Sequence, residues 1–412
     1  MLTARVLFVY GSGGAGHYAS ALALRDALLR HETRARFGDV QLRIELVDGS
    51  QLAGATNADR VYNAAVMSGL PGLTSILYWL ARTMQPLSQR VLARQMKSSI
   101  DNLQVTGGVV HLVVSFVPFL NPALLYALPH IPYLTVITDF EHSEEHPWLQ
   151  DQRQICFCPT REVARQARQL GWPDTHVQET SGMLVRGEFY EAAAALASDR
   201  ATESRTGKGN NKLIVVLFGG LPPTGLVFRI VQAVIDRKCN CTLAVVCAKN
   251  RRLKQLLESS FGVKPSAGPT TLELHGYLDT EQLAGLMARA EAIIAKPGPG
   301  VTAEADVLCV PVLFPLFGFR VMAQEQPVLR RALEQSKGIS CRSIDHLVDI
   351  IESPDQLDTM RRSIVRANNV VAGTAQDPTG PNRSLYEIVD FLVRHVPRTV
   401  TANPYVDSTV SW

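Results

Sequence analysis

The sequence predicts an α/β protein of two Rossmann-like domains that face each other across a cleft. Two glycine-rich turns carry this prediction, Gly11–Gly16 near the start of the chain and Lys296–Gly300 towards its end. Each turn follows an apolar strand pattern and precedes a helical pattern. Such a turn exposes backbone N–H groups at the positive end of a helix dipole, where an anionic group binds well. Two anion-binding turns in separate halves of the chain therefore indicate two ligand-binding domains.

Strand patterns alternate with helical stretches through both halves, which predicts a parallel sheet in each. In the first half the strand patterns are Val6–Tyr10, Leu42–Val47, Val109–Phe116, Tyr133–Thr138 and Ile155–Cys158. In the second half they are Leu213–Phe218, Leu243–Cys247, Leu272–Leu274, Ala292–Ala295 and Val310–Phe314. The last helical patterns are Gln356–Asn369 and Arg383–His395.

A change of composition divides this series into domains. Residues 191–211 are small, polar and in part glycine, so we expect a linker or hinge there. A first Rossmann-like domain then covers residues 1–190 and a second covers 212–380. Residues 381–412 form a C-terminal helix and tail, which we expect to pack back toward the first domain.

Length and composition exclude several classes. The 412 residues are 46% hydrophobic and 19% charged, with a formal net charge of +3, which is too balanced to indicate nucleic-acid binding. No run of about 20 apolar residues predicts a membrane-spanning helix, and the N-terminus has no signal-peptide layout. We expect the seven cysteines to be reduced thiols. The pairs at Cys156–Cys158 and Cys239–Cys241 resemble metal ligands, but we do not expect them to form a joint metal site. We expect a cytoplasmic protein.

A basic amphipathic stretch in the first half departs from ordinary Rossmann content. Between Leu73 and Lys97, apolar residues recur at helical spacing, while Arg82, Arg90 and Arg94 lie on other faces. A helix of this kind can lie in a lipid headgroup layer, which predicts peripheral contact with a membrane. The same pattern also fits a helix that packs on its own sheet with its arginines in water.

The first glycine turn has the form of a dinucleotide fingerprint. Gly11–Gly16 reads G-x-G-x-x-G after a strand, and Asp48 ends the next strand pattern, as in an NAD-dependent oxidoreductase. His17 weakens this alternative, because a small or apolar residue usually follows the last glycine there.

The second half offers a fuller nucleotide site. Gly219 and Gly220, with Thr224, form another turn between strand and helix that suits a phosphate, and Gly276–Leu278 offers backbone groups to a base edge. Glu304, in the first turn of a helix, suits the two ribose hydroxyls. Their order along one βαβ series favours a nucleotide site over ordinary turn chemistry.

At this point the chain resembles the monogalactosyldiacylglycerol synthase branch of the GT-B glycosyltransferases, the MurG-like group of glycosyltransferase family 28. The family's Gly-Gly-Gly-His-Arg-Ala-Ser start is similar to Gly11–Ser20, and its Lys-Ala-Gly-Pro-Gly-Thr-Ile-Ala-Glu-Ala motif to Lys296–Ala305. Three further segments agree: Thr135–Asp139 with His146–Trp148, Gly182–Arg186, and Gln324–Glu325.

The resemblance implies a GT-B fold and an inverting transfer of a hexose from a UDP-sugar to a hydroxyl of a diacylglycerol-like lipid or other hydrophobic acceptor. The first domain would bind the acceptor and the second the UDP-sugar, UDP-galactose or UDP-glucose. It implies His17 as the general base, oriented or assisted by Asp139, and acceptor contacts at Gly14, Gly16 and Trp148. No prosthetic group or metal is implied, because no D-x-D motif stands in a suitable loop. The implied donor residues are Gly219, Gly220, Thr224, Gly276, Tyr277, Leu278, Lys296, Gly298, Pro299, Gly300, Val301, Glu304, Gln324 and Glu325.

Departures from the family pattern keep alternatives open. Tyr18 replaces an arginine, Pro297 replaces an alanine, and Gln326–Pro327 stands where the family has Gly-Asn. Donor sugar and acceptor are therefore open, and a terpenoid or polyketide alcohol is an alternative acceptor. A sugar-nucleotide 2-epimerase is a further alternative, since it shares the two-domain layout, and so is a GT-B scaffold that only binds a partner or lipid.

Overall fold

The computed structural model describes residues 2–11, 15–54, 73–142, 146–202, 212–262, 269–369 and 382–401, with only the backbone for 15, 73–88, 106, 197–202, 354, 369 and 401. The chain divides into two compact units. Unit 1 comprises Met1–Leu184 together with Arg383–Trp412, and unit 2 comprises Val185–Asn382.

Unit 1 is built on a parallel sheet of six described strands. They are β1 (Leu2–Tyr10), β2 (Val40–Asp48), β3 (Leu112–Phe116), β4 (Tyr133–Val136), β5 (Ile155–Cys158) and β6 (Val177–Glu179). Their order is β2-β1-β3-β4-β5-β6, and every neighbouring pair is parallel. Strands β3, β4 and β5 are buried along their whole length, as expected for strands covered on both faces.

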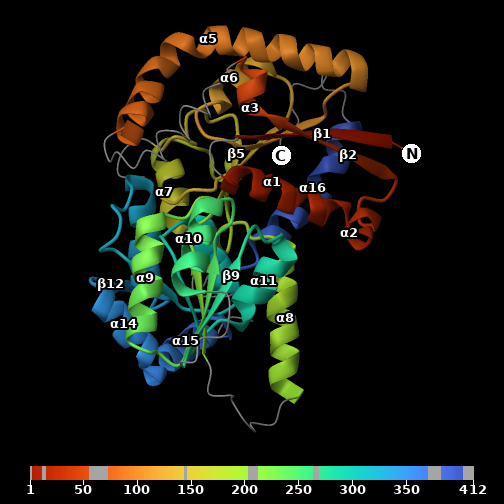
Figure 1. The fold of residues 1–412 in the computed structure, drawn as a ribbon. Helices are drawn as coiled ribbons and strands as arrows, with labels where there is room; N and C mark the ends of the chain where they lie inside the picture. Colours follow the sequence, from red (N-terminus) through yellow and green to blue (C-terminus); the bar gives the residue numbers. More distant parts are fainter. Residues whose placement is uncertain are drawn as a thin grey trace. The chain divides into compact units, whose positions relative to one another are not determined.

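Helices cover both faces of this sheet (Figure 1). The helices are α1 (Ala15–Leu29), α2 (His31–Ala35), α3 (Gly49–Leu52), α5 (Leu73–Gly107), α6 (Asn121–Ala127), α7 (Arg161–Gln169) and α16 (Ser384–Thr401), with the 3-10 turn η1 (Asp174–His176). Helices α3, α5 and α6 lie together over one face, and α1 and α16 over the other (Figure 1). The C-terminal helix α16 packs on α1 and β1, within the same compact unit.

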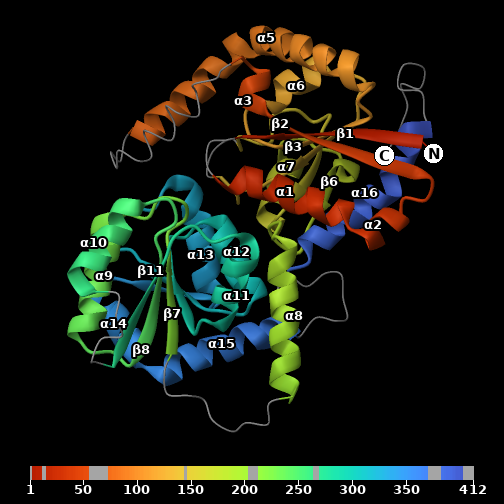
Figure 2. The ribbon, with the colours of Figure 1, turned by 45° about the vertical axis from the view of Figure 1, so that its right-hand side comes forward.

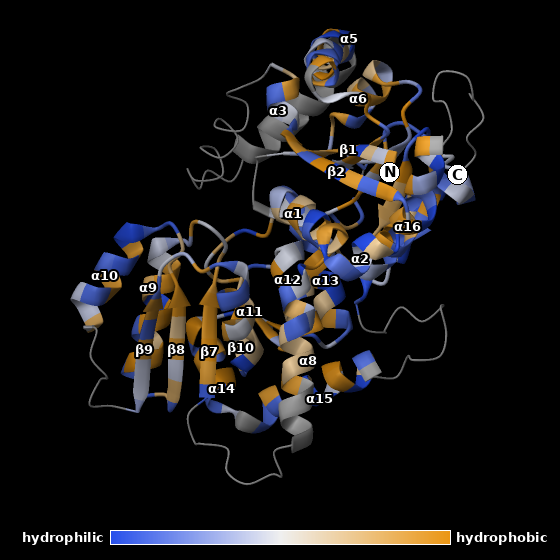
Figure 3. Cartoon of the chain, turned by 90° about the vertical axis from the view of Figure 1, so that its right-hand side faces the viewer, coloured by the Kyte–Doolittle hydropathy of each residue, from blue (hydrophilic) through white to orange (hydrophobic). Residues whose placement is uncertain are grey.

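Unit 2 repeats this architecture. Its strands are β7 (Lys212–Leu217), β8 (Cys241–Val246), β9 (Thr270–His275), β10 (Ala292–Ile294), β11 (Val312–Pro315) and β12 (Gly338–Cys341). The order is β12-β11-β10-β7-β8-β9, again parallel throughout. Figure 3 shows β7 and β8 as mainly hydrophobic and the edge strand β9 as paler, which agrees with the partial burial of β9.

Two helical layers enclose the second sheet (Figure 2). The helices are α8 (Gly187–Thr202), α9 (Thr224–Asp236), α10 (Arg251–Phe261), α11 (Thr280–Arg289), α12 (Pro299–Val307), α13 (Gln326–Glu334), α14 (Ile344–Glu352) and α15 (Pro354–Asn369), with the 3-10 turn η2 (Ala323–Glu325). Helices α9, α10 and α14 share one core with the sheet, and α11, α12 and α13 lie on the other side (Figure 2).

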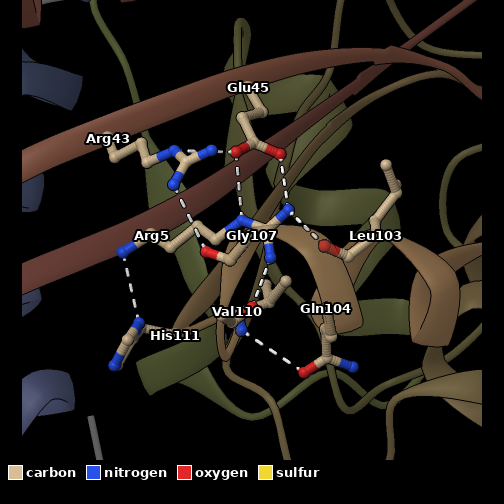
Figure 4. Close-up of polar contacts among 9 residues, drawn as sticks. Arg5, Arg43, Glu45, Leu103, Gln104, Gly107, Val110 and His111 are labelled. Carbon is tan, nitrogen blue, oxygen red and sulfur yellow. Dashed lines mark hydrogen bonds and ion pairs between the residues drawn. The ribbon is translucent and has the colours of Figure 1, made fainter.

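The long helix α5 is anchored to the sheet of unit 1 by a buried arginine at its C-terminal end (Figure 4). Arg5 of β1 pairs with Glu45 of β2 at 2.7 Å. The same guanidinium donates to the carbonyl of Leu103 at 2.9 Å and to that of Gly108, while Arg43 donates to the carbonyl of Gly107 at 3.3 Å. Gly107 and Gly108 lie at the end of α5 and just beyond it, so the two arginines bind carbonyls at this helix end and act as its cap.

In each sheet, successive strands are first added on one side of the first strand and then on its other side. The strand order therefore has one reversal point in each sheet. In unit 1 this point lies between β1 and β3, and in unit 2 between β7 and β10. In open parallel sheets, ligands bind outside the carboxyl ends of the strands at such a point. Both predicted glycine turns begin there, at the ends of β1 and β10.

Most predicted elements are confirmed. All ten predicted strands and both predicted C-terminal helices form, with ends shifted by a few residues. Two short edge strands, β6 and β12, were not predicted, because partly polar stretches of three and four residues carry little pattern.

The stretch proposed as a linker is partly helical. Helix α8 covers Gly187–Thr202, since its alanine run has high helix propensity, and the compact units divide earlier, after Leu184. Residues 203–211 lie outside the described part.

Candidate functional site

The turn after β7 leads into a helix that begins without a side-chain cap. Gly219 has a φ of +76°, a left-handed conformation that favours glycine. The carbonyl of Gly220 accepts from the backbone N–H of Lys249 at 3.2 Å, which ties the turn to the loop after β8. Helix α9 then begins without a side-chain cap, and Thr224 receives Asn250 Nδ2 on its hydroxyl at 3.1 Å. The first N–H groups of α9 therefore face the edge of the sheet without a capping side chain.

The turn after β10 provides a second such helix start. Gly298 is the residue before α12, it offers no side-chain cap, and Pro299 occupies the first turn. The N–H of Gly298 donates to the carbonyl of Lys296 at 2.7 Å, which tightens the turn. Gly300 and Val301 follow within the first turn of α12. The two uncapped helix starts thus flank the reversal point between β7 and β10.

Lys296 is held by a buried carboxylate. Its Nζ lies 2.8 Å from Oε1 of Glu325, whose side chain is only 4% exposed. The other oxygen of Glu325 accepts from the N–H of Met322 at 3.2 Å. Both carboxylate oxygens of Glu325 are therefore engaged inside unit 2, and its role here is to position the ammonium group at the edge of the sheet.

Glu304 is held by an arginine that the sequence analysis quoted only as part of a motif. Arg186 donates to Oε1 of Glu304 through Nη2 at 2.7 Å and Nε at 3.1 Å. Its Nη1 donates to the hydroxyl of Thr280 at 3.0 Å. Glu304 is 13% exposed, and burial raises the pKa of its carboxyl, an effect that Arg186 opposes. The position of Arg186 at the end of the Gly182–Arg186 motif was the signal that could have identified this pair.

The remaining predicted donor residues follow other strands at the same edge. Gly276, Tyr277 and Leu278 come directly after β9, and the Tyr277 side chain is 71% exposed. Gln324 lies in η2 after β11, and its Nε2 contacts the sulfur of Met322 at 3.7 Å. The fold of unit 2 therefore brings the predicted donor residues to the carboxyl ends of β7, β9, β10 and β11.

In unit 1 the corresponding edge carries a histidine held by a hydroxyl. His17, in the first turn of α1, places Nδ1 2.9 Å from Oγ1 of Thr138, which follows β4. Gly16 precedes it and is exposed, and a side-chain carbon at that position would meet no atom within 4 Å. Gly14 lies outside the described residues.

Asp139 and Trp148 bind each other beside His17. Asp139 was expected to orient His17, but its Oδ2 accepts from Trp148 Nε1 at 2.8 Å. Trp148 was expected to contact the acceptor, but it is 0% exposed and packs in a core with Ile137 and Trp172. Its ring centroid lies 5.6 Å from that of His17. The buried indole thus has its N–H paired with a carboxylate, as is usual for a buried tryptophan.

A second histidine braces the same loop. His146 is buried, with Nε2 3.1 Å from the carbonyl of Phe140 and Nδ1 accepting from the N–H of Trp148 at 3.4 Å. Burial lowers the pKa of His146 to about 3, so this imidazole is neutral at physiological pH. Its ring stacks edge-on against His142 at 4.8 Å. The sequence analysis used His146 only as a motif residue.

Other observations bear on the alternatives. Asp48, which the oxidoreductase alternative assigns to a ribose, caps α3 by accepting from the N–H and hydroxyl of Ser50 at 2.8 and 2.6 Å. Within the described ranges, no three His, Cys, Asp or Glu side chains are grouped to hold a metal ion. No helix in the part searched is both long and apolar enough to cross a bilayer.

Known proteins can now be compared with this chain. No protein-family model matches it. A probable monogalactosyldiacylglycerol synthase 2, chloroplastic, of Oryza sativa subsp. japonica is 26% identical over 334 residues, which cover 75% of this chain and 65% of that protein. Monogalactosyldiacylglycerol synthase 3, chloroplastic, of Arabidopsis thaliana is 23% identical over 366 residues, 84% of this chain and 73% of that protein. The chain is a homologue of the monogalactosyldiacylglycerol synthases. It spans just under two thirds of the rice homologue.

Solved structures agree with this relationship at the level of the fold. MurG of Acinetobacter baumannii matches with a TM-score of 0.56 at 13% identity, over 95% of this chain and 99% of that one. A UDP-GlcNAc 2-epimerase of Neisseria meningitidis, bound to UDP-GlcNAc, matches with a TM-score of 0.55 at 14% identity, over 95% and 100%. The chain therefore has a GT-B fold of two Rossmann-like domains, as predicted.

Proposed function

We propose that the chain is an inverting glycosyltransferase that moves galactose from UDP-galactose to a hydroxyl of a diacylglycerol-like lipid. The observation that carries this proposal is the edge of unit 2, where two uncapped helix starts, Lys296 and Glu304 meet at the reversal point of the sheet. The printed names of the homologues favour galactose and a diacylglycerol acceptor over the other candidates.

In this proposal the nucleotide binds along the carboxyl edge of unit 2. The backbone of Gly276–Leu278 pairs with the uracil edge, and the ribose hydroxyls donate to Oε2 of Glu304, because Arg186 already occupies Oε1. The diphosphate lies over the turns at Gly219–Gly220 and Gly298–Gly300. Gln324 then receives the sugar hydroxyls. Glu325 acts through Lys296, since both of its oxygens are engaged.

In this proposal, unit 2 raises the rate by stabilising the leaving diphosphate. As the bond between C1 and the diphosphate breaks, negative charge grows on the phosphate oxygen. Preorganised N–H groups at the starts of α9 and α12 and the ammonium of Lys296 stabilise that charge without reorganisation. The buried Glu325 fixes Lys296 in place, so the ammonium meets the transition state in one orientation.

Unit 1 supplies the proton chemistry. His17 takes the proton of the acceptor hydroxyl as the oxygen attacks C1 from the face opposite UDP, so the anomeric configuration inverts. A histidine suits this task because its pKa lies near the working pH of an enzyme. The exposed Gly16 leaves room beside His17 for the acceptor.

We also propose peripheral contact with a membrane through α5, in a cytoplasmic protein whose seven cysteines are free thiols. The described half of α5 packs Ala93, Met96 and Ile100 into its own core, as in the alternative in which the helix simply covers its sheet. Its other face exposes Val91 beside Arg90 and Arg94. Sedimentation with anionic vesicles should decrease in Arg90→Glu/Arg94→Glu, and not in the exposed control Arg168→Glu. Equal sedimentation of all three proteins would remove α5 from the interface.

Product analysis tests the proposed reaction. The full chain is incubated with UDP-galactose and diacylglycerol vesicles, and lipid and nucleotide products are identified by mass spectrometry and anomeric NMR. We expect β-galactosyl diacylglycerol and UDP in equal amounts, and more product than with UDP-glucose. Release of N-acetylmannosamine from UDP-N-acetylglucosamine without an acceptor would establish the epimerase instead. Binding of NADH without any UDP-sugar would favour the oxidoreductase, and transfer only to a terpenoid or polyketide alcohol would change the acceptor.

A further inference from the structure

A hydroxyl contacts the His17 ring, and the residue that carries it is followed in the sequence by a carboxylate. Thr138 is almost completely buried, and its Oγ1 lies 2.9 Å from His17 Nδ1. The adjacent Asp139 accepts the indole N–H of Trp148 at 2.8 Å. The indole ring that holds this carboxylate has its centroid 5.6 Å from that of the His17 imidazole.

The segment that presents Thr138 is firmly held. Trp148 is fully buried and its carbonyl accepts from Gln154 at 2.8 Å. On the other side, His146 spans the carbonyl of Phe140 and the N–H of Trp148. A hydroxyl on so constrained a backbone has a defined position, so it can set the orientation and tautomer of the imidazole that it contacts.

We propose that Thr138 is the positioning residue for the base, and that its Oγ1 accepts the Nδ1–H of His17 so that Nε2 takes the acceptor proton. This inference rests on the proposed function for its catalytic consequence. In the step, the proton of the acceptor hydroxyl passes to Nε2, the oxygen forms its bond to C1, and the bond from C1 to UDP breaks. Nε2 returns its proton to solvent afterwards. Nδ1 keeps its proton throughout.

The assignment separates Thr138 from Asp139. A hydroxyl partner selects a tautomer without adding a negative charge beside the base, whereas a carboxylate partner would stabilise the imidazolium. Asp139 holds the indole N–H of Trp148, and the Trp148 ring lies beside the His17 ring. Loss of the Asp139 charge should therefore change packing more than it changes the tautomer of His17.

The test uses four variants of the full chain with ¹⁵N-labelled histidine. Thr138→Val removes the hydroxyl at constant shape, Thr138→Ser restores it, and His17→Gln identifies the His17 resonance. Thr135→Val is the matched control, because it removes a buried hydroxyl of β4 that contacts Gln154 rather than His17. Side-chain ¹⁵N shifts report the tautomer, and kcat and KM are measured with UDP-galactose and diacylglycerol.

We expect Nδ1 of His17 to be protonated in the wild type and in Thr138→Ser, and the tautomers to mix in Thr138→Val. The kcat of Thr138→Val should fall about 10²-fold, within the range of general-base effects, while the KM for UDP-galactose stays unchanged and Thr138→Ser recovers most of the rate. A wild-type spectrum with Nδ1 deprotonated, or an unchanged tautomer in Thr138→Val, would overturn the proposal. If the wild type transfers no sugar, the proposed function fails, and the spectra still decide the role of Thr138.

Discussion

The two units share one architecture but carry different chemistry at the same edge of the sheet. In unit 2 that edge holds fixed charges and dipoles: the pairs Lys296–Glu325 and Arg186–Glu304 beside two uncapped helix starts. In unit 1 it holds a histidine against a hydroxyl and a buried indole. Fixed, paired charges suit the binding of an anion, and an oriented imidazole suits proton transfer. The difference fits the proposed division of labour, in which unit 2 binds the donor and unit 1 supplies the base.

Loss of His17, the proposed base, should give the largest effect among these predictions, a fall in kcat. His17→Ala removes the proton acceptor, so kcat should fall by about 10²- to 10⁴-fold. The proposed UDP contacts lie in unit 2, so UDP affinity should be unaffected. Steady-state kinetics with UDP-galactose, together with a UDP titration, check both expectations. Activity within a few-fold of the wild type would mean that another group of unit 1 takes the proton.

Loss of the Arg5 anchor should lower the stability of unit 1 without changing the affinity of unit 2 for UDP. Arg5→Met leaves Glu45 half of its ion-pair network and uncaps α5, so unit 1 should lose about 3 kcal/mol of unfolding free energy. UDP affinity of the folded protein should not change. Denaturant unfolding measures the loss. The control is Arg168→Met, which breaks exposed ion pairs and should cost less than about 1 kcal/mol; equal losses would contradict the anchoring role.

Protonation of the Glu304 carboxylate should weaken donor binding at low pH. Burial raises the pKa of Glu304, so as pH falls through that raised pKa the carboxyl gains a proton and stops accepting from the ribose. UDP affinity should decrease on the acid side in the wild type and lose this dependence in Glu304→Gln. Titration calorimetry across pH, with the exposed Glu334→Gln of α13 as a charge-matched control, makes the measurement. A pH dependence that persists in Glu304→Gln would place the titrating group elsewhere.

The smallest expected effect concerns His146 of unit 1. Its pKa is lowered from 6.5 to about 3, so the unfolded chain binds a proton between these values while the folded one does not. Stability is therefore present above pH 6.5 and is lost as pH falls through this window, by about 1.4 kcal/mol between pH 7.5 and 5.5. Unfolding at both pH values should show this loss in the wild type. His146→Gln should lose less, because its own contribution is absent while those of His111 and His142, whose pKa values burial also lowers, remain. An equal loss in that variant would contradict the assignment.

Much of this organisation was readable from the sequence, because long apolar strands and glycine turns carry strong local patterns. The predicted strands formed, and the fold class and family relationship were confirmed. The edge strands β6 and β12 escaped prediction because few of their residues are apolar. The contacts of Asp139 and Trp148 escaped it for another reason: residues next to each other in a motif can turn to different partners, and only the tertiary packing decides which. The contact of Arg186 with Glu304 and that of Thr138 with His17 also depend on tertiary packing, so only the structure identified them.

The most direct test of the division of labour is a calorimetric UDP titration of His17→Ala and Glu304→Gln beside the wild type. Removal of a hydrogen bond to a charged group costs about 1.5 to 3 kcal/mol, so Glu304→Gln should bind UDP roughly 10- to 100-fold more weakly. His17→Ala should bind UDP as the wild type does. Wild-type affinity in Glu304→Gln, or a comparable loss in His17→Ala, would contradict the assignment of donor binding to unit 2 and proton transfer to unit 1.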